Sequence, residues 1–151
     1  MSVASIASVK HSTLFPPDVG PLQAAAWQAL NDHSGAWVML VRADGIVLHI
    51  NDVLLAAARV NRDDVIGQHV SRIIHPTCVD ERVSYYAKVA QEGAPLCIEG
   101  IIGGGLVRCC LHPILASAPG QPPCTLCVSR PIAPDAPPPG IPVVRAKCDD
   151  R

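Results

Sequence analysis

Cysteine side chains, which can bind metals or react with oxidants, are concentrated in the last third of this chain, where a histidine lies close to two of them. Cys109, Cys110 and His112 lie close together, and Cys124 and Cys127 follow in a Cys-x-x-Cys spacing. Thiolate and imidazole are the usual ligands of zinc, and low-pKa thiols are the usual redox sensors. The spacing therefore indicates two candidate functions for this region, a metal site and a redox-active thiol cluster.

Strand geometry argues against a metal site built on the Cys-x-x-Cys spacing. Positions i and i+3 of a strand point to opposite faces, so Cys124 and Cys127 need a turn between them to bind one ion. Vicinal Cys109 and Cys110 also face oppositely, and two ligands on one face do not complete a tetrahedral site. A redox- or metal-responsive regulator, with haem or a Cys-ligated metal, is kept as the alternative function. Its metal would be held by a set of four residues: His75, Cys110, His112 and Cys127.

His49 is the residue that we expect to make an internal pocket polar. It alternates with Val47 on an apolar strand, on the face that should point into the fold. A titratable group in an apolar pocket is a natural anchor for a ligand. The expected pocket residues are Val47, His49, Ile73, Val83, Tyr86 and Leu111. The core is expected to contain these apolar residues together with Ile66, Ile98 and Leu126.

The motifs of common enzyme classes are missing from the sequence. Gly103-Gly104-Gly105 lacks the Lys and Ser/Thr of a phosphate-binding loop, and a further strand follows it. There is no Gly-x-Ser-x-Gly elbow and no His-Glu-x-x-His zinc motif. We therefore expect a protein that is not an enzyme.

The composition limits the kinds of partner that this chain is expected to bind. The 151 residues carry 12 Lys and Arg against 13 Asp and Glu, and aromatic residues make up 3%. This near-neutral, aromatic-poor chain gives no sign of direct nucleic-acid binding. No apolar run reaches the ~20 residues of a membrane span, and Lys10 follows the mildly apolar N-terminal stretch, which is the wrong order for a secretory signal. We expect a cytoplasmic protein whose seven cysteines are thiols.

The apolar pattern changes period along the chain and predicts an α+β domain. A helix is expected over residues 22–30, and Asp44-Gly45 predicts a hairpin turn between two strands. Asp52 is expected to cap a helix over 53–58, and a long helix should run from Pro76 or Thr77 to about Gly93. The expected strands are 37–41, 46–50, 96–102, 106–115 and 124–130.

The ends of the chain are predicted to lie outside the domain. Residues 1–19 should be a flexible leader and residues 20–132 the folded domain. Six of the twelve residues from Pro131 to Pro142 are proline, so residues 133–151 should form an extended tail or linker. Cys148 in this tail is expected to be the most reactive thiol, and deletion of the tail should leave the melting temperature unchanged.

The order of these features resembles the PAS sensory domain. The resemblance rests on the Asp44-Gly45 turn, Asn51 after the second strand, Val65-Ile66-Gly67, Ile74-His75-Pro76 and the Ser129-Arg130 exit. It implies a five-stranded antiparallel sheet with short helices on one face and an N-terminal flanking helix. It also implies a sensory or protein-interaction module in bacterial signal transduction or transcription regulation, which binds a small apolar ligand or none.

The same resemblance bears on partners and cofactors. A homodimer formed through residues 22–30 and the outer face of the sheet is expected, with a downstream regulatory protein as a further partner. The Pro-rich exit is similar to the sensor half of PAS regulators joined to a LuxR-type DNA-binding domain, although no helix-turn-helix follows here. Haem-binding members use a His near the long helix, where Arg82 stands instead. Flavin-binding members carry an Asn-Cys-Arg-Phe-Leu-Gln-like helix, which Thr77-Cys78-Val79-Asp80 does not match. Both haem and flavin are therefore disfavoured.

Overall fold

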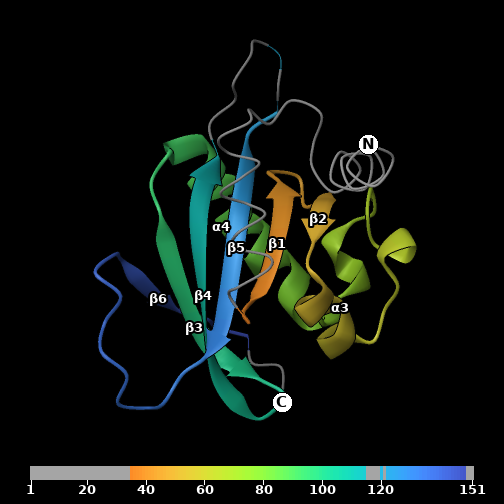
Figure 1. The fold of residues 1–151 in the computed structure, drawn as a ribbon. Helices are drawn as coiled ribbons and strands as arrows, with labels where there is room; N and C mark the ends of the chain where they lie inside the picture. The colour runs from red at the N-terminus through yellow and green to blue at the C-terminus, as the bar shows by residue number, and fades with distance from the viewer. Residues whose placement is uncertain (1–34, 115–119, 121, 149–151) are drawn as a thin grey trace, which may run out of the picture.

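A single mixed sheet forms the centre of the computed structural model, which describes residues 35–114, 120 and 122–148. Its strand order is β2-β1-β5-β4-β3-β6, with the helices gathered on one face (Figure 1). The strands are β1 Trp37–Arg42, β2 Val47–Ile50, β3 Leu96–Ile102, β4 Gly105–Ile114, β5 Cys124–Pro131 and β6 Val143–Arg145. The helices are α3 Asp52–Ala58, α4 Val79–Glu92, and the short 3₁₀ turns η1 Arg62–Asp64, η2 Val70–Arg72 and η3 Pro76–Cys78.

The hairpin between β1 and β2 is the turn that Asp-Gly predicted. Gly45 has φ of +88°, a conformation that glycine adopts without strain. A Cβ on Gly45 would also lie 2.8 Å from Nε2 of His69, so the close approach of the next loop requires glycine here. The Asp44 carboxylate accepts a hydrogen bond from the Ile46 amide and pairs with Arg42 at 2.5 Å.

Asn51, and not Asp52 as the sequence suggested, caps the first helix. Its Oδ1 accepts from the Leu54 amide at 3.0 Å and from the Val38 amide at 3.2 Å. Its Nδ2 donates to the Ala36 carbonyl at 2.8 Å. Asn51 is 3% exposed, so one buried amide side chain both starts α3 and ties it to β1. Asp52 instead forms an exposed ion pair with Arg62.

The long helix lies across the sheet and forms the second layer of the domain. Pro76 opens η3, which runs directly into α4, and Gly93 ends α4 with φ of +66°. Tyr86 and Val89 are buried on the side that faces the sheet. The hydroxyl of Thr125, on β5, donates to the Tyr86 carbonyl at 3.0 Å. These boundaries confirm the predicted long helix.

The two faces of the sheet contribute to separate apolar clusters. The inner cluster, between the sheet and the helices, contains Val41, Val47, Ile50, Val89, Ile98 and Leu111 among others. The outer cluster contains Ala36, Val38 and Leu40, with half-buried Leu48, Ile114, Cys124, Leu126 and Val128 against it. Leu126 was expected in the inner core and lies on the outer face, because it is one residue from Cys127, which points inward.

The C-terminal segment corrects the predicted tail, because residues 143–148 are part of the fold. β6 pairs in parallel with β3, and the Ala146 amide donates to the Glu99 carbonyl at 2.8 Å. Ala146 is 8% exposed and packs in the inner cluster. The prolines precede β6 and so do not prevent its pairing. The five-stranded antiparallel sheet that we expected is therefore extended by a sixth, parallel strand at the β3 edge (Figure 1).

Two predictions fall on segments that the structure does not describe. The expected helix over residues 22–30 and the leader over residues 1–19 both lie outside the described residues. Within the described residues, neither α3 nor α4 has the length and apolar content of a membrane-crossing helix.

Candidate functional site

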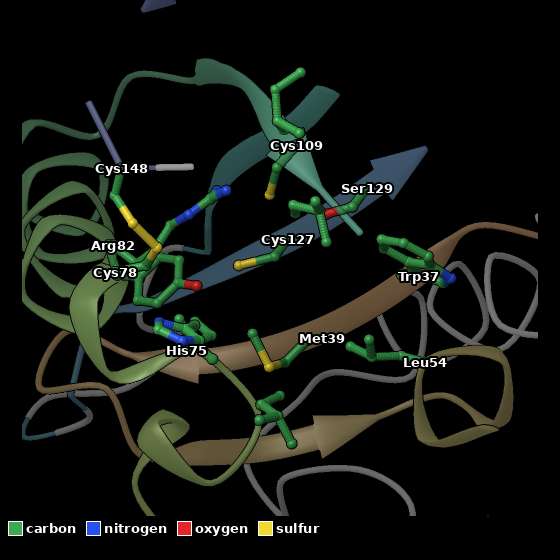
Figure 2. Close-up of a pocket in the computed structure, with 15 residues that line it drawn as sticks. Trp37, Met39, Leu54, His75, Cys78, Arg82, Cys109, Cys127, Ser129 and Cys148 are labelled. Carbon is green, nitrogen blue, oxygen red and sulfur yellow. A yellow bond between two sulfur atoms is a disulfide. The ribbon is translucent and has the colours of Figure 1, made fainter. Parts of the chain in front are cut away.

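A cavity of about 130 Å³ lies between the inner face of the sheet and the helical layer. Its apolar wall includes Trp37, Met39, Leu54, Ile73, Ile74, Ile101 and Ile102. Its polar and sulfur-containing wall consists of His75, Cys78, Arg82, Tyr86, Cys109, Cys127, Ser129 and Cys148. Figure 2 shows Arg82, Cys109 and Cys127 directed toward the same space, with Trp37 and Leu54 on the other side.

Arg82 is the cationic side chain of this cavity. It lies on α4, one turn after Cys78 and one turn before Tyr86, so the three residues share the helix face that looks at the sheet. Among the described residues there are three ion pairs, Arg42–Asp44, Arg62–Asp52 and Arg108–Glu99, and none of them includes Arg82. The positive charge of Arg82 is therefore free to act on groups in the cavity.

Cys109 and Cys127 form a hydrogen-bonded thiol pair on the floor of the cavity. They lie on neighbouring antiparallel strands, and Cys109 is directly opposite Ser129 in the register of β4 and β5. The hydrogen bond with Cys127 is the largest cause that lowers the pKa of Cys109, and with Arg82 and Ser129 it brings this pKa to about 7 against the effect of burial. Burial, together with the neighbouring Cys109, raises the pKa of Cys127 well above its ordinary value. Cys109 is thus the thiol that ionises, and Cys127 stays protonated and donates to it.

Tyr86 supplies a neutral hydroxyl beside this pair. Burial is the largest cause that raises its pKa well above 10.0, and the thiols at Cys127 and Cys109 act in the same direction. The phenol therefore stays protonated at any physiological pH. Donors from Tyr86, Ser129 and Arg82 line one side of a cavity whose other side is apolar, which suits a small molecule with one polar end.

The C-terminal segment closes the cavity on the side of α4. A disulfide joins Cys148 to Cys78, whose Cα atoms are 5.5 Å apart. The Glu81 carboxylate accepts from the Lys147 amide at 2.9 Å and from the Cys148 amide at 3.3 Å. Because both sulfur atoms of this disulfide belong to the cavity wall, the position of residues 146–148 determines the shape of the cavity (Figure 2).

The disulfides correct the expectation that all seven cysteines are thiols. Cys97 and Cys110 also form a disulfide, because the β3–β4 register places them directly opposite each other with Cα atoms 4.1 Å apart. Cys148, expected to be the most reactive thiol, is bonded to Cys78 because the tail returns to the domain. Among the described residues, the cysteines that form no disulfide are Cys109, Cys124 and Cys127.

Two of the six expected pocket residues, Ile73 and Tyr86, line the cavity. Val47 and Leu111 are completely buried in the inner cluster, and Val83 packs against that cluster. These three residues support the cavity without lining it.

His49 does not line the cavity, although it is 2% exposed. A β-bulge between Leu40 and Val41 shifts the register, so that His49 pairs with Leu40 of the outer cluster while Ile50 points inward. The strict alternation from Val47 that placed His49 inside fails because a bulge moves the following residues to the other face.

The four residues of the alternative metal site are divided between the two faces of the sheet. His75 and Cys127 line the inner cavity, whereas Cys110 and His112 line a groove on the outer face. Cys110 is also bonded to Cys97. These four side chains therefore cannot bind one ion, and the opposite orientations that strand geometry predicted for the cysteine pairs are confirmed.

Arg82, Cys109 and Ser129 were not among the residues predicted for the pocket. The signal for Arg82 was present, since Cys78, Arg82 and Tyr86 follow each other at intervals of four residues. Cys109 and Ser129 could have been paired only with the β4–β5 register, which the sequence does not specify.

No protein-family model and no curated protein sequence matches this chain. Solved structures do match. The PAS domain of BvgS from Bordetella pertussis superposes with a TM-score of 0.60 at 20% identity, covering 74% of this chain and 87% of that one. A domain of an HTR-like protein from Haloarcula marismortui gives 0.59 at 17% identity, covering 66% of this chain and 99% of that one. This chain has the PAS fold.

A third neighbour belongs to a longer protein. VqmA from Vibrio cholerae, one of the LuxR-type receptors, superposes with a TM-score of 0.60 at 14% identity. The match covers 72% of this chain and 52% of VqmA, so the likeness concerns about half of that receptor. VqmA is also known bound to DPO, with a TM-score of 0.57 to this chain.

Proposed function

We propose that this PAS domain is a signal-transduction sensor that binds a small, mostly apolar molecule in the cavity between its sheet and α4. The supporting observation is the cavity itself, which joins an apolar wall to convergent donors from Arg82, Tyr86 and Ser129. A cavity of similar volume, about 150 Å³, accommodates benzene in an engineered protein. A ring of about six to nine non-hydrogen atoms therefore suits this one in size.

Ligand occupancy would be transmitted through the wall that the ligand touches. Cys148 contributes to this wall, and the adjoining residues 143–145 pair with β3 at the edge of the sheet. A ligand that changes the packing of α4 against the sheet also changes the position of this C-terminal segment, because Glu81 of α4 binds its backbone. The output partner in this proposal is a regulatory protein or domain that contacts the segment.

Thermal unfolding in the presence of benzene and indole tests the binding proposal. Because a ligand at 100 times its Kd adds about 2.7 kcal/mol to the free energy of unfolding, a clear rise in melting temperature is expected. Ile73→Phe should fill the cavity and abolish the rise, and Leu126→Phe on the outer face should keep it. A rise that persists in Ile73→Phe, or the absence of any rise with both probes, would contradict binding in this cavity.

We also propose that the module is a homodimer. The outer face carries half-buried apolar side chains, including Leu48, Leu126 and Val128, which a second subunit together with residues 22–30 would cover. Light scattering of the chain without residues 1–33 should show a shift toward monomer. A dimer that survives this truncation would place the interface elsewhere.

A further inference from the structure

The thiol pair Cys109 and Cys127 has a chemistry that ligand binding does not use. Both sulfur atoms lie at the cavity wall and are hydrogen-bonded to each other, and Arg82 and Ser129 also hydrogen-bond to Cys109. The residues come from three elements, α4, β4 and β5, so the cluster exists only in the folded protein. A thiol in an electropositive site next to a second thiol is the arrangement typical of redox-sensor cysteines.

We propose that Cys109 is a site of oxidation by small hydroperoxides, with Arg82 and Cys127 as positioning residues. The Cys109 thiolate attacks the nearer peroxide oxygen, an S–O bond forms, and the O–O bond breaks. The sulfur is oxidised to sulfenic acid, and the leaving oxygen is reduced to alkoxide or hydroxide and takes a proton from water. For hydrogen peroxide, thiolate plus HOOH gives sulfenic acid plus hydroxide.

Each neighbour of Cys109 favours this step. The Cys127 thiol donates a hydrogen bond that stabilises the thiolate, and the pKa of Cys109 of about 7 leaves roughly half of it ionised at neutral pH. The Arg82 guanidinium, which has no carboxylate partner among the described residues, can stabilise the negative charge that develops on the leaving oxygen. The protonated phenol of Tyr86 places no negative charge near the reacting sulfur.

The cavity selects for small oxidants. Its volume of about 130 Å³ admits hydrogen peroxide but not a bulky disulfide such as oxidised glutathione. Cys124 provides an internal comparison, since it is a cysteine of the same strand β5 that forms no disulfide, is more exposed and lies on the outer face. Exposure alone therefore predicts that Cys124 reacts faster, whereas the cluster predicts that Cys109 reacts faster.

The experiment treats the full chain with hydrogen peroxide, removes the peroxide with catalase and unfolds the chain in iodoacetamide, so that peptide mass spectrometry counts the remaining thiol at each cysteine. Unfolding before alkylation removes any dependence on access to the cavity, and the thiol lost at Cys109 includes both sulfenic acid and any disulfide that it forms with Cys127. At neutral pH the larger thiolate fraction of Cys109, reduced by its lower intrinsic nucleophilicity, predicts oxidation about threefold faster than for a thiol of ordinary pKa. We expect Cys109 to lose its thiol faster than Cys124. Slower oxidation of Cys109 than of Cys124 overturns the proposal.

Two variants test whether the Arg82 side chain, and not the loss of any charge from α4, accelerates the oxidation of Cys109. Arg82→Gln should slow the oxidation of Cys109 about tenfold, because the leaving oxygen loses a donor. Lys88→Gln removes one charge from an exposed position of the same helix and should leave the rate unchanged. Equal rates in the parent and in Arg82→Gln overturn the role of Arg82.

A pH profile of the parent chain gives a measurement that needs no variant. The rate of Cys109 alkylation by iodoacetamide should rise with a midpoint near 7, the pKa that its neighbours set. The groups that face Cys109 are Arg82 and Tyr86 from α4 and Cys127 and Ser129 from β5, and His75 of η3 shares the cavity. A midpoint near the ordinary thiol value of about 8.5 contradicts the ionisation of Cys109 at neutral pH.

Oxidation does not require a bound ligand, so it is tested independently of the proposed ligand binding.

Discussion

The inner and outer faces of the sheet differ in chemistry although the same strands form both. On β4 and β5, Cys109 and Cys127 face the helices and have strongly shifted pKa values, whereas Cys110 and Cys124 face outward. The inner face is sealed by α4 and by residues 146–148, whereas the apolar side chains of the outer face are mostly half-buried. A single-residue step along a strand therefore decides whether a cysteine is a tuned thiol or a surface group.

The largest expected difference between the faces is in stability. Ile98→Ala removes a completely buried side chain from the inner cluster and should lower the free energy of unfolding by about 2–5 kcal/mol. Leu126→Ala on the outer face removes a half-buried side chain and should cost about 1 kcal/mol. Urea titration of both variants measures this. Equal losses would show that the outer face is as well sealed as the inner one.

A second variant tests Asn51, whose side chain joins β1 to the helical layer. β1 carries part of the outer cluster. Asn51→Ala removes the cap of α3 and the two buried hydrogen bonds that join Asn51 to the Val38 amide and the Ala36 carbonyl. We expect a loss of about 2–4 kcal/mol in the free energy of unfolding.

Asn61 offers the matched control for this substitution. It is the N-cap residue of η1, is exposed, and makes no side-chain capping bond. Asn61→Ala should change the free energy of unfolding by less than about 0.5 kcal/mol in the same titration. A loss in Asn51→Ala no larger than that in Asn61→Ala would contradict the role of Asn51.

Two strand glycines test how tightly the C-terminal segment seals the inner face. A Cβ on Gly100 would lie 2.9 Å from Cβ of Ala146, so Gly100→Ala must displace the segment and should cost about 1–3 kcal/mol. A Cβ on Gly105 would meet only the Ile102 carbonyl oxygen at 3.9 Å, so Gly105→Ala should be neutral or slightly stabilising.

The double-mutant cycle makes this test specific. In a chain that ends at Pro142, Ala146 is gone and the cost of Gly100→Ala should disappear, because the two changes act on one contact. A cost that persists in the shortened chain would mean that the C-terminal segment is not its cause.

Local signals in the sequence predicted most of the fold. The Asp44-Gly45 turn, the Pro76 start and Gly93 end of the long helix, and the strand limits near Leu96 and Cys124 were all correct to within a few residues. Each depends on the conformational preference of one or two residues. β6 was missed because a three-residue strand that pairs with β3, some forty residues earlier in the chain, has no local signature.

The site was predicted less well because register and bulges determine it. Of the residues expected at the pocket, Tyr86 and Ile73, which lie on or beside the helices, line the cavity. His49 was placed on the wrong face by a bulge that no residue type in β2 signals. Cys109 was expected to be a thiol, but its low pKa results from contacts with Cys127 and Arg82 that exist only after folding.

The smallest expected effect is at the exposed turn that precedes β2. The hydrogen bond from Arg42 is the largest cause that holds the pKa of Asp44 below its ordinary value of 3.8. A carboxyl group with a lowered pKa in the folded state stabilises the protein above its unfolded pKa, and this contribution is lost as the pH falls through the folded pKa. Asp44→Asn should therefore destabilise the protein at pH 6, by less than about 1 kcal/mol because the pair is exposed, and the loss should become smaller as the pH falls toward 2. Urea titrations at both pH values, with Asp135→Asn as a control for the loss of one exposed charge, measure this difference. If Asp44→Asn costs as much stability at pH 2 as at pH 6, the turn is held by the shape of the side chain and not by its charge.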